Sequence, residues 1–234
     1  MAKNDNLGDY LKDIADAIRE KKGTTEPINA QDFADEIASI EGGGDTSIED
    51  SIVTRKITSY TNERVTSIGN QAFMNATSLK SISFPNAKSA GLSSFNACTS
   101  LTDVDLPLLE SVNTQTFYGC NALVRLNLPK LKTASVQSVR NCDKLSIVDL
   151  GASTSISALS FDNCPALECF IVRTSSLCKL AATSALTNTP IASGTGYIYV
   201  PASLVDSYKK ASNWSTYASQ IRAIEEYPDI TNEP

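Results

Sequence analysis

Apolar residues recur through the middle of this chain at a fixed interval of 22 positions. The interval holds between residues 65 and 172 in several registers at once. The aromatic register contains Phe73, Phe95, Phe117, Val139 and Phe161, and the leucine register contains Leu79, Leu101, Leu123, Leu145 and Leu167. Two more registers contain Ile82, Val104, Leu126, Val148 and Phe170, and Phe84, Leu106, Leu128, Leu150 and Val172. A period of this length predicts a solenoid of stacked repeats.

Each repeat contains Leu-x-x-Ile-x-Leu, whose last two apolar positions alternate as in a half-buried strand. Pro85, Pro107 and Pro129 then stop the strand by removing a backbone donor. The Phe and Cys positions, three residues apart, favour one tight helical or 3-10 turn. Because one coil cannot bury its own apolar residues, neighbouring coils must stack. We therefore predict an α/β repeat solenoid with one parallel strand and one short helical turn in each 22-residue unit.

Two shorter patterns precede the repeats and predict a helical hairpin at residues 1–41. Spacings of three and four residues place the apolar positions of each helix on one face. These candidate assembly residues are Leu7, Leu11, Ile14 and Ile18 on the first helix and Phe33, Ile37 and Ile40 on the second. An isolated hairpin of this length is marginal in water, so we expect a second copy or another protein to cover it. We further expect a Gly-rich hinge at 42–50, the solenoid at 51–200 and a C-terminal cap at 201–234.

Composition narrows the possible functions. The 234 residues have a formal net charge of -6 and no histidine. Without histidine, Ser-His-Asp and Cys-His catalysis and imidazole-dependent zinc sites are excluded. The lack of a basic block argues against nucleic acid, or an anionic membrane surface, as the main partner. The start of the sequence lacks the basic-then-apolar order of a signal peptide, and no run of 18 apolar residues occurs, so we expect synthesis in a cytoplasm without membrane insertion.

The cysteines form a second ladder in the repeats. Cys98, Cys120, Cys142 and Cys164 occupy the position that Ala76 fills in the first repeat. Residues stacked on adjacent coils lie at a separation that permits a disulfide. The substitution by alanine instead favours small, buried and reduced side chains. Cys169 and Cys178 have no partner that the sequence identifies.

Polar residues on the outward strand positions define a candidate binding surface. It contains Asp103, Asp105, Arg125, Asn127, Ile147 and Asp149. Parallel stacking would place Asp105, Asn127 and Asp149 in one row, and such a row of oxygens could hold a cation or a sugar. The alternative is an ordinary solvated sheet face, which we favour. An active carboxylate pair would need burial in a cleft, which nothing here predicts, so no cofactor and no catalytic residue are expected.

Aromatic residues gather late in the chain, at Tyr197, Tyr199, Tyr208, Trp214 and Tyr217. They could form a platform for a carbohydrate. An open solenoid end must also be covered, and a helix at residues 201–211 with Leu204 and Tyr208 four residues apart could cover it. We favour the cap.

The repeat consensus, best matched from Ile68-Gly69 through Pro85, closely resembles the BspA-like leucine-rich repeat family. That resemblance implies interaction, because family members are bacterial surface proteins and adhesins as well as phage and prophage proteins. The segments 11–19 and 25–33 resemble the leader of phage structural and tail proteins of Gram-positive hosts. We therefore expect a non-enzymatic virion component for host recognition or decoration. Its partners would be a protein or surface glycan, other virion proteins and further copies of the chain. The alternative is a bacterial surface or intracellular binding module of the same family.

Overall fold

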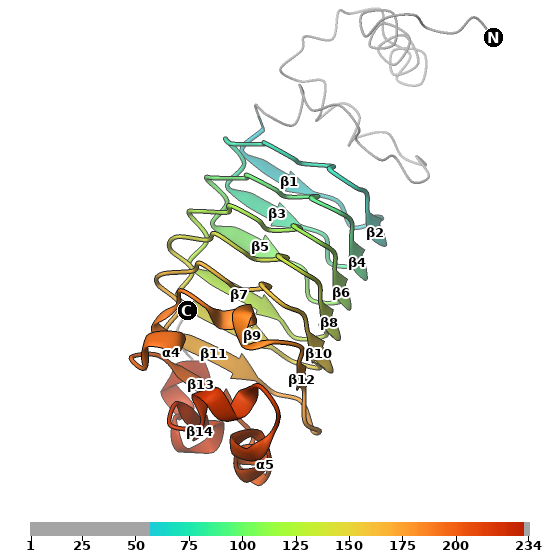
Figure 1. The fold of residues 1–234 in the computed structure, drawn as a ribbon. Coiled ribbons are helices and arrows are strands. Elements are labelled where there is room, and N and C mark those ends of the chain that lie inside the picture. The colour runs from blue at the N-terminus through green and yellow to red at the C-terminus, as the bar shows by residue number, and fades with distance from the viewer. Residues whose placement is uncertain (1–56, 232–234) are drawn as a thin grey trace, which may run out of the picture.

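Two ladders of parallel strands run side by side along the molecule (Figure 1). The computed structural model describes residues 57–231. The broad ladder consists of β1 (Ser59–Thr61), β3 (Ser81–Ser83), β5 (Asp103–Asp105), β7 (Arg125–Leu128), β9 (Ile147–Leu150), β11 (Cys169–Val172), β13 (Tyr197–Val200) and β14 (Ile221–Ala223). The narrow ladder consists of β2 (Ser67–Ile68), β4 (Ser89–Ala90), β6 (Ser111–Val112), β8 (Thr133–Ala134), β10 (Ser155–Ile156) and β12 (Lys179–Leu180). Each of the first six coils therefore contributes one strand to each ladder, and β13 and β14 extend the broad ladder alone.

The register of the strands follows the sequence period. Ile82 pairs with Val104, and Leu126 pairs with Val148, so that equivalent positions of successive repeats lie side by side. The coils lengthen toward the C-terminus, where Phe170 pairs with Ile198. The broad ladder is two hydrogen-bonded sheets, one of β1, β3 and β5 and one of β7, β9, β11, β13 and β14. The narrow ladder is one six-stranded sheet.

Two details of the predicted coil are wrong. Each coil has two strands instead of one, because a two-residue strand that ends on a buried residue such as Ala90 or Val112 pairs with its neighbours in parallel. The segment between the two ladders is also a turn and not a helix. Residues in the left-handed region interrupt it, with φ of 57° at Gln71 and 62° at Asn75. A right-handed helix cannot continue through a left-handed residue. Asparagine adopts the left-handed conformation more readily than most other residues.

The core lies between the two ladders and contains the predicted registers. The phenylalanine rings stack along the solenoid, with centroids 5.3 Å apart between Phe73 and Phe95 and between Phe95 and Phe117. The four ladder cysteines are fully buried, as predicted. Each thiol donates to a backbone carbonyl of the preceding coil, for example Cys120 Sγ to Phe95 O at 3.3 Å. Burial raises the pKa of the Cys98 thiol to about 12.

Short helices and aromatic side chains cover the C-terminal end of the solenoid. Tyr208 and Trp214 are buried and bond to the backbone of Cys178, through the Tyr208 hydroxyl at 3.0 Å and the Trp214 indole N–H at 2.7 Å. These helices are η1 (Thr183–Leu186), α4 (Pro190–Ser193), η2 (Ala202–Leu204), α5 (Val205–Lys210), η3 (Trp214–Tyr217), η4 (Ile224–Glu226) and η5 (Pro228–Thr231). The predicted hairpin and hinge lie outside the described residues.

Candidate functional site

The outward residues of the broad ladder, which we call the front face, change character along the solenoid. β1, β3 and β5 present hydroxyls and carboxylates, and the exposed Asp105 accepts a hydrogen bond from Ser83 Oγ at 2.6 Å. Arg125 and Asn127 come next on β7. Asn127 pairs with Asp149, but Asp105 pairs with Ser83 and belongs to the other sheet. The predicted row of three oxygen-bearing residues is therefore divided between two sheets.

Asp149 is not the solvated carboxylate that the sequence suggests. Its side chain points outward from β9, yet the residue is only 5% exposed. Arg173, just after β11, covers it with a bidentate pair, Nε to Oδ1 at 2.9 Å and Nη2 to Oδ2 at 2.8 Å. The hydrogen bond to Asp149 raises the pKa of Arg173. Since both carboxylate oxygens accept from Arg173, this pair fixes the surface in place of binding a cation.

Beyond this pair, the front face becomes aromatic. Tyr197, Tyr199 and Tyr227 with Arg222 form a cluster that we call the tyrosine patch. The Tyr199 ring lies between the other two, at centroid distances of 6.4 Å from Tyr197 and 5.3 Å from Tyr227. The Arg222 guanidinium lies 4.8 Å from the Tyr197 ring centroid. Tyr197 and Tyr227 are each 38% exposed, so the patch offers aromatic surface to a partner.

The tyrosine patch is held by the strands beneath it. Tyr199 is nearly buried, and burial raises the pKa of its hydroxyl to about 12, with smaller contributions from Cys169 and the neighbouring tyrosines. It pairs with Ile171 on one side and Arg222 on the other. Ile171 points outward but is fully buried, which shows that the surface here is closely packed. Ile147 and Cys169, half-buried, continue this part of the front face toward β9.

The late aromatic residues thus divide between the two functions weighed from the sequence. Tyr208, Trp214 and Tyr217 are buried and cap the solenoid, and Tyr217 donates its hydroxyl to Thr183 O at 2.7 Å. Tyr197 and Tyr199 belong to the front face. The sequence missed Arg173, Arg222 and Tyr227, because all three follow the last regular repeat and their positions depend on the lengthened coils.

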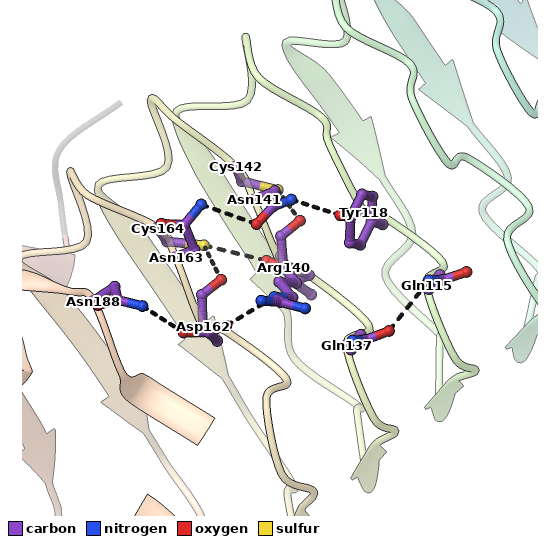
Figure 2. Close-up of polar contacts among 11 residues, drawn as sticks. Gln115, Tyr118, Gln137, Arg140, Asn141, Cys142, Asp162, Asn163, Cys164 and Asn188 are labelled. Carbon is purple, nitrogen blue, oxygen red and sulfur yellow. Dashed lines mark hydrogen bonds and ion pairs between the residues drawn. The ribbon is translucent and has the colours of Figure 1, made fainter. Parts of the chain in front are cut away.

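A polar network links the turns between the two ladders (Figure 2). Gln115 donates to Gln137 across one step of the solenoid at 3.2 Å, and Asn163 donates to Asn141 at 3.0 Å. The buried Asp162 forms an ion pair with Arg140, Nε to Oδ2 at 2.7 Å. It also accepts from Asn188 at 3.1 Å. These side chains bond to one another, so the network stabilises stacking of the turns.

The described part of the chain has no cluster of three or more His, Cys, Asp or Glu residues that could hold a metal ion. Across residues 57–231, no helix combines the length and the apolar character needed to cross a membrane.

The repeats match a known family. The BspA type leucine rich repeat region matches residues 51–179 in six copies, and the chain belongs to this family. Comparison with curated proteins gives no match.

Two solved structures of bacterial proteins share the fold. The pneumococcal vaccine antigen PcpA has a TM-score of 0.54 and 17% identity, with 71% of this chain and 40% of that chain covered. A leucine rich cell surface protein from Faecalibacterium prausnitzii has a TM-score of 0.53 and 22% identity, with 64% of this chain and 41% of that chain covered. A leucine rich repeat protein of T. pallidum has a TM-score of 0.45 and 21% identity, with 50% and 58% covered. The chain thus spans 58% or less of each of these structures.

Proposed function

We propose that this chain is a non-enzymatic binding module that recognises a protein or a surface glycan through its front face. The observation that carries the proposal is the tyrosine patch, in which Tyr197 on β13 and Tyr227 just after η4 are each 38% exposed. Tyrosine and arginine are the residues most often responsible for binding energy at protein surfaces. Tyrosine contributes large contact area at a low cost in side-chain entropy.

The rigidity of the site supports the same function. Tyr199 is fixed by its neighbouring strands, and the pair of Arg173 with Asp149 holds the adjoining surface in one arrangement. A surface that is already ordered loses little conformational freedom when a partner binds. Asp103, Asp105, Arg125 and Asn127 extend the front face as polar contacts on β5 and β7, away from the patch.

The particle context is a further part of the proposal. The leader-like segments 11–19 and 25–33 resemble phage structural and tail proteins, which favours a virion component that presents the solenoid for host recognition or decoration. In this arrangement, the candidate assembly residues of 1–41 join other virion proteins or further copies of the chain.

A bacterial surface protein is the second candidate. Two proteins with the same fold, a cell surface protein and a vaccine antigen, favour it. Mass spectrometry of purified particles and of washed host cells separates the two contexts. The virion proposal expects the chain in particles, and its presence only on cells would contradict that proposal.

Binding itself is tested with isolated cell walls of a Gram-positive bacterium as the probe. A Tyr197→Ala, Tyr227→Ala double variant should bind at least about tenfold more weakly than the unchanged chain, because it removes both exposed rings. Tyr118→Ala is the matched control, since Tyr118 lies in the turn network, where its hydroxyl accepts from Asn141. Equal binding by all three proteins would contradict a role for the tyrosine patch.

A further inference from the structure

The narrow ladder carries a continuous row of hydroxyl groups on its outer side. In each of its first five strands, the residue before the buried one is serine or threonine, and these residues pair in register. We call them the hydroxyl row, and they are Ser67, Ser89, Ser111, Thr133 and Ser155. The first two hydroxyl oxygens, on Ser67 and Ser89, are 2.8 Å apart. The sequence repeats serine or threonine at this position every 22 residues. Only the second strand of each coil shows that these hydroxyls lie side by side.

Two different borders flank the hydroxyl row. On the side before each strand lie Lys88, Glu110 and Lys132, with Lys132 Nζ 2.6 Å from Glu110 Oε2. The hydrogen bond from Lys132, supported by the charges of Lys132 and Lys88, lowers the pKa of Glu110. After β4 and β8, Leu92 and Val136 are each 43% exposed, and Thr114 fills the equivalent position after β6. The chain thus places a charged border, a hydroxyl row and an aliphatic border in parallel along the solenoid.

The chemistry of this surface differs from that of the tyrosine patch. Glycine, asparagine and serine fill the next outward positions at Gly91, Asn113 and Ser135. The outward residues of β2, β4, β6, β8 and β10 and of their two borders include no aromatic residue and no arginine. Protein partners usually bind through such anchors, so a folded protein is a poor fit. A polymer with repeated hydroxyl groups fits this surface better, because it can form hydrogen bonds with successive members of the row.

Spacing and charge narrow the type of polymer. Strands of a sheet are about 4.8 Å apart, so a linear polymer that lies along the solenoid axis can contact several coils in succession. Lys88, Lys132 and Lys179 outnumber the single carboxylate of Glu110 along this ladder, although the whole chain has a net charge of -6. Charge complementarity therefore favours a polymer with carboxylates.

We propose that the hydroxyl row and its charged border bind an anionic linear polysaccharide that lies along the solenoid axis. The hydroxyl row exchanges hydrogen bonds with ring hydroxyls, and Lys88 and Lys132 pair with carboxylates. Leu92 and Val136 contact the apolar faces of the rings. The hydroxyl of the row recurs in each of the first five coils, so affinity increases with polymer length. This site is independent of the tyrosine patch.

The test measures binding of the full chain to polymannuronate, a β-1,4-linked polymer with one carboxylate in each ring. One triple variant replaces hydroxyls of the row, Ser89→Val, Ser111→Val and Thr133→Val. The matched control makes the same three changes on the front face, Ser59→Val, Ser81→Val and Thr61→Val. We expect the first variant to bind at least about tenfold more weakly, because it loses three sites of hydrogen bonding. The control should bind like the unchanged chain.

The charge of the ligand is tested separately. Lys88→Ser with Lys132→Ser should weaken binding of polymannuronate and reduce its dependence on salt, while neutral β-1,4-mannan should bind the unchanged chain weakly. Failure of the unchanged chain to bind polymannuronate would overturn the proposal, as would equal losses in the row and control variants. If mannan binds the unchanged chain as tightly as polymannuronate does, the inference that the ligand is anionic is wrong. Self-association that disappears in the row variant would assign this face to a second copy instead and overturn the proposal.

Discussion

Replacing Leu126 with alanine tests whether the coils share one stacked core. Leu126 lies on β7 near the middle of the solenoid, is fully buried and pairs with Val148 of the next coil. The change removes three carbon atoms, which corresponds to about 2.4 kcal/mol of lost burial at about 0.8 kcal/mol for each. A residual cavity adds to this loss, so the free energy of unfolding should fall by about 2–5 kcal/mol.

Urea denaturation measures this change with two probes. Far-ultraviolet circular dichroism follows the strands, and fluorescence follows Trp214, the single tryptophan of the chain, which is buried in the cap. Asn127→Ala is the matched control, because Asn127 is the next residue on the same strand and is exposed. It should change the free energy of unfolding by about 0.5 kcal/mol or less. A loss below about 1 kcal/mol for Leu126→Ala would refute the burial of the central coil.

Four more predictions concern charges, thiols and the leader. Arg173→Met should destabilise the protein by about 1–3 kcal/mol in urea denaturation, because Asp149 stays buried without its partner. Thiol reagents should label the four ladder cysteines only on unfolding, and mass spectrometry that finds a bridge between two of them would contradict this. Burial raises the pKa of Cys98 from 9.0 and of Tyr208 from 10.0, each to about 12. The unfolded chain therefore loses these protons at a lower pH than the folded chain, and deprotonation favours unfolding. Stability should therefore fall as pH rises from about 9 to 12, and thermal unfolding that does not change over this range would contradict it. Deletion of residues 1–44 should leave a folded monomer that no longer joins its assembly. If the shortened chain keeps the oligomeric state of the full chain in sedimentation, the solenoid makes those contacts instead.

The sequence predicted the solenoid because burial imposes a strict period. Every coil must present the same apolar positions to its neighbours, so Phe95, Leu126 and the ladder cysteines are all buried as expected. It did not predict the narrow ladder, because a strand of two residues has too few positions for alternation to appear. Left-handed turn residues such as Gln71 carry no clear signal either, since glutamine has no special preference for that conformation.

The candidate site was harder to predict, because outward positions can vary without changing the fold. Alternation correctly placed Asp149 outward, but its burial depends on Arg173, which reaches it from beyond β11. Tyr227 and Arg222 join the tyrosine patch only because the coils after β11 are longer. Contacts of this kind arise from the three-dimensional course of the chain and have no fixed interval in the sequence.

Hydroxyl-radical labelling of tyrosine, with the chain free and bound to Gram-positive cell walls, tests the proposed function most directly. Tyr197 and Tyr227 are exposed when the chain is free, so both should be labelled. Binding through the front face should then protect these two residues and leave labelling of Tyr118 in the turn network unchanged. Equal labelling of Tyr197 and Tyr227 in the free and wall-bound chain would contradict the account.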